Sequence, residues 1–196
     1  MHMGLIDIAL ILQLFVLINP FSSFPVLISA HKNKMNVRKI AISASILALV
    51  IAIVIALIGS SLFGLFGVTA DSFRIAGGIF LLLLGLDTIR AKNEEKKQVG
   101  KVDSLISILA TPLLTGPATI SFITIKTLEI GRAAILPNIL IAFILVGIVF
   151  VLFSFTIKKI NTRVVEISSK ILGLFLTAMA IELISRGIYN IFVGFA

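Results

Sequence analysis

The sequence lacks cysteine altogether and is poor in histidine and in charged residues. Without cysteine, the chain can form no disulfide, no thiolate metal site and no cysteine nucleophile. The two histidines, His2 and His31, lie far apart at expected loop positions, so a metal site would lack clustered ligands. Charged residues make up 13% of the chain, against about 25% in soluble domains. These shortages argue against thiol or metal chemistry and against a soluble protein.

Enzyme chemistry finds little support in the remaining polar residues. Asp71 and Asp87 are sixteen residues apart on one expected helix, about 24 Å, which is too far for two carboxylates to share a proton. Ser22 and Ser23 have no evident base beside them that could activate a serine nucleophile. We therefore expect that the protein is not an enzyme and that it uses no cofactor.

Apolar residues are what the sequence has in abundance. They make up 59% of the chain, and the mean hydropathy is +1.18. Six stretches are long enough to cross a hydrocarbon core about 30 Å thick, which takes about 20 helical residues. They lie at residues 6–30, 40–66, 72–90, 103–127, 133–157 and 167–190. The sequence therefore predicts an all-α, polytopic membrane protein in which residues 1–196 form one membrane domain.

The basic residues are distributed unevenly between the connections. The first, third and fifth connections carry thirteen of them, in the groups Lys32 to Lys39, Arg90 to Lys101 and Lys158 to Lys170. The second and fourth connections carry three, which are Arg74, Lys126 and Arg132. By the positive-inside rule, the first group of connections faces the cytoplasm and both termini are external. We expect these clusters to orient the protein in the cell membrane and to attract anionic lipid, with no binding of nucleic acid.

The two halves of the chain resemble each other. A shift of 92 residues superposes two pairs of prolines, and a shift of 96 aligns residues 73–90 with residues 169–186. Each half, 1–91 and 101–196, contains three expected spans. Because three is odd, the second half begins on the opposite side of the membrane, so the repeats are inverted, as in many secondary transporters. Chance similarity between apolar, glycine-containing helices is the alternative for the second alignment.

The two proline pairs stand inside apolar spans, in NPFSSFP (residues 19–25) and TPLLTGP (residues 111–117). Proline lacks the N–H that a helix interior needs, and it forces the preceding residue out of the α region. We expect the first and fourth helices to be broken there, at membrane depth. Unpaired backbone survives at that depth only inside the protein or beside a wet cavity, so the breaks should face inward and each other. The alternative is a pair of ordinary proline kinks whose free carbonyls are bonded by nearby Ser and Thr.

A broken helix offers backbone groups to a ligand. Its N–H groups attract a carboxylate and its carbonyls attract an ammonium group, which suits a small zwitterion. Neighbouring side chains add uncharged donors and acceptors, and a glycine allows close approach. The predicted substrate-binding residues are Asn19, Pro20, Ser22, Ser23, Phe24, Pro25, Thr111, Pro112, Thr115, Gly116, Pro117 and Thr119.

Further polar residues and glycines lie in the third and sixth spans. Glu182 and Arg186 are four residues apart, hence on one helical face, where they form a local ion pair or where Glu182 couples transport to an ion. The glycines of the third span, Gly77, Gly78 and Gly85, are expected to allow close packing of helices rather than contact with a ligand.

Two motifs carry a resemblance to a known family. INPFSSFPVL (residues 18–27) and ATPLLTGPATI (residues 110–120), in a chain of about 200 residues with six spans, closely resemble the MarC family of integral membrane proteins. The resemblance implies transport of small neutral amino acids such as glycine and alanine, driven by a gradient of protons or sodium ions. It also implies that the broken first and fourth helices hold the substrate.

The sequence thus predicts a secondary active transporter that works by alternating access around a midplane site. A passive channel or a non-transporting structural membrane subunit is the alternative. Neither the direction of transport, nor the coupling ion, nor the oligomeric state follows from the sequence.

Overall fold

The computed structural model describes residues 6–90, 116–157 and 161–194. Every element in these ranges is helical, which confirms the all-α fold class. The elements are α1 (Ile8–Ile18), the 3-10 helix η1 (Pro20–Ser23), α2 (Phe24–Lys32), α3 (Val37–Phe66), α4 (Ala70–Arg90), α6 (Pro117–Ile130), α7 (Arg132–Thr156) and α8 (Thr162–Gly194).

Five of the described segments are long and apolar enough to cross a membrane. They are Ile8–Lys32, Val37–Gly59, Ala70–Arg90, Arg132–Thr156 and Arg163–Val193, and they match the first, second, third, fifth and sixth expected spans. The expected fourth span, 103–127, lies largely outside the described residues. Its described part belongs to α6, whose 14 residues extend about 21 Å, less than the thickness of the hydrocarbon core. The count of six spans therefore stays a prediction.

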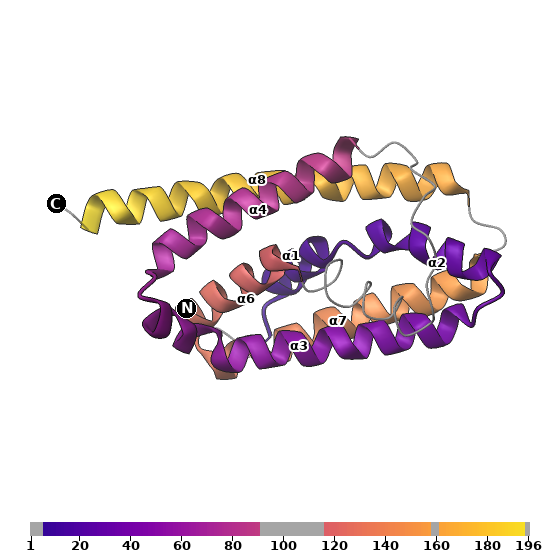
Figure 1. Cartoon of the computed structure of the whole chain (residues 1–196), viewed down its shortest axis with the longest axis horizontal. Coiled ribbons are helices and arrows are strands. Elements are labelled where there is room, and N and C mark those ends of the chain that lie inside the picture. Colours follow the sequence, from indigo (N-terminus) through magenta and orange to yellow (C-terminus); the bar gives the residue numbers. More distant parts are fainter. Residues whose placement is uncertain (1–5, 91–115, 158–160, 195–196) are drawn as a thin grey trace.

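The helices are arranged in three layers (Figure 1). One outer layer is the pair α4 and α8, which share the most extensive contact in the molecule, and the other is the pair α3 and α7. The shorter helices α1, α2 and α6 lie between the two pairs, where α6 contacts α3, α4 and α7. The turn between α1 and α2 and the helix α6 thus lie between the two outer pairs.

Glycines allow α4 and α8 to approach each other closely. A Cβ atom added at Gly85 would lie 3.0 Å from the carbonyl oxygen of Gly173, and one added at Gly173 would lie 3.2 Å from that of Gly85. A Cβ atom at Gly78 would lie 3.0 Å from the carbonyl oxygen of Ala180. In lipid no hydrophobic effect drives helices together, so their association depends on close packing of this kind. The predicted packing role of Gly78 and Gly85 is confirmed.

Alanines have a similar role on α3. Five of them recur every three or four residues and are at most 1% exposed, so they form one buried stripe along the helix. They are Ala41, Ala44, Ala48, Ala52 and Ala56. Large apolar side chains on the outer surfaces of the pairs stay exposed, for example Leu152 at 59% and Leu174 at 60%. An apolar outer surface of this kind is what a bilayer solvates and water does not.

Basic residues gather at one end of the bundle. Lys32, Lys34 and Arg38 lie where α2 meets α3, the same end at which α8 begins and toward which α4 runs (Figure 1). The helix α8 finishes at the opposite end. This arrangement is the one that the positive-inside argument requires, although the side of the membrane that each end faces stays a prediction.

Candidate functional site

The first proline motif ends a helix. Pro20 has no N–H to donate to the carbonyl of Val16, and α1 stops at Ile18. Asn19 takes the left-handed conformation, with φ 43° and ψ 68°, and its N–H donates to the carbonyl of Phe15 at 3.1 Å. Asparagine is one of the few residues that adopt this conformation readily. The four-residue turn η1 follows, and α2 begins at Phe24 with Pro25 in its first turn, where a missing N–H costs nothing.

Two buried polar side chains at this interruption have no hydrogen-bonding partner. Asn19 is 3% exposed and Ser23 is 0% exposed. Neither the amide nitrogen and oxygen of Asn19 nor the hydroxyl of Ser23 finds a partner within the described part of the chain. Leaving such a group unpaired costs about 1–3 kcal/mol, so native proteins rarely keep one without a purpose. Asn19 and Ser23 therefore form the strongest candidate for ligand contact.

Ser22 differs from its neighbour. Its hydroxyl donates to the carbonyl of Asn19 at 2.7 Å, and its backbone N–H donates to the same oxygen at 3.1 Å. Both bonds hold the turn closed after α1. Ser22 thus stabilises the interruption, and its hydroxyl is already engaged.

Phe24 anchors the segment to α7. Its ring is 4% exposed and stacks on Phe153, with ring centres 3.6 Å apart. Phe150 and Phe21 contact the same ring at 6.2 Å and 5.2 Å. Sequence reasoning missed these partners on α7. Pro20 is buried in the bundle, whereas Pro25 is exposed.

The second proline motif is described only at its end. Thr111, Pro112 and Thr115 lie outside the described residues. Gly116 is extended, with φ −67° and ψ 175°, and α6 begins at Pro117. Proline suits the first position of a helix because its fixed φ fits and its absent N–H is not needed there.

Four hydroxyl side chains of α6 are buried, namely Thr119, Ser121, Thr124 and Thr127. Thr124 and Thr127 donate to backbone carbonyls one turn earlier, at 2.8 Å and 2.7 Å. Gly77 of α4 leaves room for Ser121, since an added Cβ would lie 2.3 Å from the Ser121 Cβ. Gly59 of α3 leaves room for Thr124 in the same way. Thr119 was predicted because it lies beside the second proline motif, whereas Ser121, Thr124 and Thr127 were not identified from the sequence.

A charged cluster joins three helices at the end of the bundle opposite to Lys32, Lys34 and Arg38. Arg74 of α4 pairs with Asp71 and with Glu129 of α6, the latter at 2.6 Å, and Lys126 pairs with Glu129 at 2.8 Å. Asn190 of α8 donates to Asp71 at 3.0 Å.

Glu129 lies two residues beyond the expected fourth span. Partial burial acts to raise its pKa, but hydrogen bonds and charge from Lys126 and Arg74 outweigh burial, so the pKa lies below its ordinary value of 4.5. The carboxylate therefore stays ionised at neutral pH, and the cluster stays charged.

Glu182 and Arg186 form the predicted ion pair on α8, at 2.5 Å. Their side chains are 61% and 63% exposed, so the pair lies on the outer surface of α8 and not between the helices. Among the described residues, no three side chains of His, Cys, Asp or Glu group closely enough to hold a metal ion.

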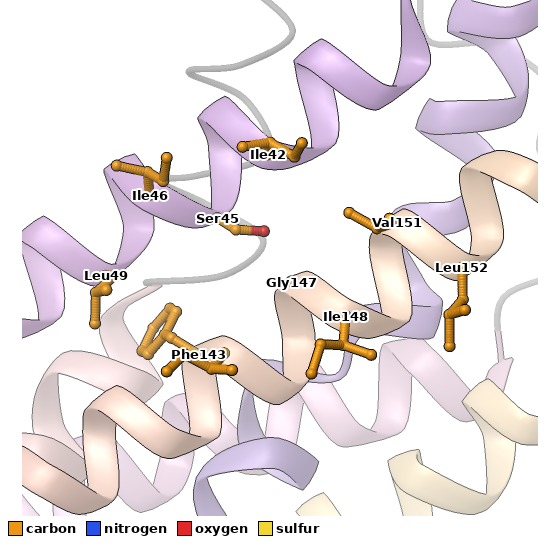
Figure 2. Close-up of a pocket in the computed structure, with 10 residues that line it drawn as sticks. Ile42, Ser45, Ile46, Leu49, Phe143, Gly147, Ile148, Val151 and Leu152 are labelled. Atoms are coloured by element: carbon orange, nitrogen blue, oxygen red, sulfur yellow. The ribbon is translucent and has the colours of Figure 1, made fainter.

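A groove between α3 and α7 is separate from all of these residues (Figure 2). Its volume is about 400 Å³, and its lining is apolar apart from Ser45. The Ser45 hydroxyl donates to the carbonyl of Ala41 at 2.9 Å and so needs no further partner. None of the predicted binding residues lines this groove, and its apolar walls do not suit a zwitterion.

Comparison with known proteins identifies the family of the chain. A family profile described as MarC family integral membrane protein matches residues 6–192. The chain belongs to the MarC family. Similar members include a UPF0056 membrane protein of Methanocaldococcus jannaschii, 31% identical over 92% of this chain and 85% of that protein.

Two bacterial members of the MarC family show comparable similarity. A UPF0056 membrane protein of Aquifex aeolicus is 30% identical over 96% of this chain and 94% of its own length. The UPF0056 membrane protein YhcE of Escherichia coli is 30% identical over 92% of this chain and 91% of its own length. No solved structure matches the chain.

Proposed function

We propose that this MarC protein is a secondary active transporter of small neutral amino acids such as glycine and alanine. The observation that carries the proposal is the pair of buried, unpartnered side chains of Asn19 and Ser23 at the end of α1. An integral membrane protein that keeps unpaired donors and acceptors inside its helical bundle has a use for them there.

The chemistry of this point in the bundle suits a zwitterion. The Asn19 amide supplies one donor group and one acceptor, and the Ser23 hydroxyl supplies both. The carbonyl of Val16 lacks its helical hydrogen bond because Pro20 has no N–H to donate. Carbonyls at the end of a helix carry negative partial charge. An ammonium group is attracted to that end, while the carboxylate pairs with the amide and the hydroxyl. A ligand with both charges close together satisfies all of these groups.

The second half of the chain completes the site in this proposal. Gly116 and the first N–H groups of α6 lie in the middle layer, and α6 contacts α1. The predicted residues Thr111, Pro112 and Thr115 immediately precede this helix. A helix N-terminus favours a carboxylate, so α6 is the natural partner of the ligand's negative end.

An inverted repeat is supported by which helices pack together. The most extensive contacts join α4 to α8 and α3 to α7, and each pair runs antiparallel. Each pair consists of the corresponding helices of residues 1–91 and 101–196. A two-fold axis in the membrane plane relates helices in this way.

The cluster around Arg74 is the gate of this proposed alternating-access cycle. Its ion pairs join α4, in the first half, to α6, in the second, and therefore close one end of the bundle. When that end opens, the Arg74–Glu129 contact must break. For ion coupling, Glu129 is a better candidate than Glu182, because it lies between the halves whereas Glu182 is exposed. Its lowered pKa means that Glu129 takes up a proton only after its ion pairs with Arg74 and Lys126 break.

Counterflow in proteoliposomes tests the proposed function. Vesicles loaded with unlabelled alanine should accumulate labelled alanine or glycine, with no current when a voltage is applied. A current without counterflow would indicate a channel. No movement of any small neutral amino acid, with or without a gradient of protons or sodium ions, would indicate a structural subunit.

A further inference from the structure

The groove between α3 and α7 has the shape of a trough along the two helices. Its lining on α3 recurs at Ile42, Ser45 and Leu49, and its lining on α7 recurs every three or four residues from Phe143 to Leu152. At its centre, Gly147 has no side chain and faces Ser45 (Figure 2). A Cβ atom added at Gly147 would lie 3.9 Å from the Ser45 Cβ, so two small residues create the hollow.

The walls of the groove require an apolar occupant. Ile46, Ile144 and Ile148 are 49–57% exposed, and the one polar side chain, that of Ser45, is bonded internally. A volume of about 400 Å³ is at the lower end of the ~300–1,000 Å³ of small-molecule sites. One flexible hydrocarbon chain suits this volume and shape better than a folded partner does.

A cation closes one end of the groove. Arg38 lies one turn before Ile42 on α3, and its guanidinium carbon is 5.3 Å from the centre of the Phe155 ring. Phe155 lies one turn after Leu152 on α7, so this cation–π pair continues the line of the groove. Arg38 is exposed, and it is at the end of the bundle where basic residues gather. Headgroups of a bilayer lie at that depth.

We propose that this groove binds an anionic phospholipid, with one acyl chain along Ile42 to Leu49 and the phosphate group on Arg38. The planar guanidinium is suited to phosphate because it can donate two parallel hydrogen bonds. The ring of Phe155 holds it in place. Neither Asn19 nor Ser23 lines the groove, so the proposal of lipid binding and the proposal of amino acid transport can be tested independently.

The test compares two lipids with the same acyl chains. The purified protein in detergent is titrated with phosphatidylglycerol or with phosphatidylcholine, and bound lipid is counted by native mass spectrometry. We expect phosphatidylglycerol to bind more tightly. Arg38→Gln should weaken its binding about fivefold, the effect of one basic residue at an anionic surface. It should weaken phosphatidylcholine binding less, because the choline cation of that lipid offsets the charge of its phosphate.

Two further variants localise the effect. Arg163→Gln is the matched control, because Arg163 is an exposed arginine at the same end of the bundle but on α8, away from the groove. It should bind phosphatidylglycerol as the wild type does. Gly147→Leu places a side chain in the groove and should weaken binding of both lipids. Circular dichroism checks that this variant folds.

Three results would overturn the proposal. One is equal affinity of the wild type for the two lipids, and another is an equal effect of Arg38→Gln and Arg163→Gln. The third is a dimer, detected by cross-linking, that Gly147→Leu abolishes while lipid binding persists. That last result would assign the groove to a second copy of the chain.

Discussion

Asn19 and Ser23 are buried without partners, whereas Ser22, between them in the same turn, has its hydroxyl engaged. The free energy consequences of removing these groups are therefore opposite. Replacing an unpaired buried group by alanine loses no hydrogen bond and relieves a desolvation penalty. Replacing Ser22, whose hydroxyl is paired, removes one of the donors to the Asn19 carbonyl.

This contrast gives a prediction for three alanine variants. Asn19→Ala and Ser23→Ala should each weaken alanine binding at least about tenfold, since one lost hydrogen bond to a charged ligand group is worth roughly 1.5–3 kcal/mol. The melting temperature of Ser23→Ala should be unchanged or higher, whereas Asn19→Ala should lose about 1–2 kcal/mol of stability because alanine adopts the left-handed conformation of position 19 less readily. Ser22→Ala should lose about 0.5–1.5 kcal/mol of stability and keep most of its binding. Binding in detergent and thermal unfolding measure both quantities.

If Ser22→Ala and Ser23→Ala lower the melting temperature equally and leave binding intact, both serines are structural. Phe153→Ala provides a reference for lost packing alone, since Phe153 stacks on Phe24 far along the chain. It should be strongly destabilising, by about 3–5 kcal/mol.

At this scale the sequence predicted the position of the break but not the role of each residue in it. The chemistry of proline alone places the end of α1 near Asn19. The direction in which each serine points depends on the 3-10 turn that follows, and the contact of Phe24 depends on α7, more than 120 residues later. Neither is visible in a local pattern.

Helices in this molecule are held together by small residues. The backbones of α4 and α8 approach each other closely at Gly85. Gly59 and Gly77 make room for hydroxyl side chains of α6. The hydrophobic effect that packs helices of soluble proteins is absent in lipid. Free energy lost with a close helix contact is therefore not recovered by burying larger side chains.

A pair of glycine substitutions tests this packing. A Cβ added at Gly85 would lie 2.6 Å from the Thr177 hydroxyl and 3.0 Å from the Gly173 carbonyl oxygen, whereas at Gly147 the nearest atom is 3.9 Å away. Gly85→Ala should therefore destabilise the protein by about 1–3 kcal/mol. Gly147→Ala should be neutral or stabilising by up to about 1 kcal/mol, because alanine favours helix. Thermal unfolding in detergent measures both, and equal effects would contradict the packing described for α4 and α8.

The sequence predicted the long helices well, because length and lack of charge define a span. The expected third span, 72–90, corresponds to α4 at Ala70–Arg90. The expected sixth span, 167–190, is shorter than α8 at Thr162–Gly194, because the helix already begins at the polar residues Thr162 and Arg163 and continues to Gly194. The burial of Ser121 and Thr124 on α6 was not predictable, since it depends on glycines in two other helices.

For the whole molecule, the central idea is a site enclosed between two outer helix pairs. The pairs α4–α8 and α3–α7 surround α1, α2 and α6, so the unpaired groups of Asn19 and Ser23 are separated from lipid. The cluster around Arg74 closes one end. Alternating access requires that water and substrate nevertheless reach these groups in one state of the cycle.

The absence of cysteine allows a direct measurement of that access. Ser23→Cys in the otherwise unchanged chain provides a single thiol at the proposed site, and a water-soluble thiol reagent reports whether the thiol is reached in membrane vesicles. Lys39→Cys, at an exposed position on α3, is the control.

We predict that Cys at position 23 reacts and that saturating alanine slows its reaction several-fold, while the reaction of Cys at position 39 is unaffected. No reaction at position 23, or the same rate with and without alanine and glycine, would contradict a substrate site at the interruption of the first span.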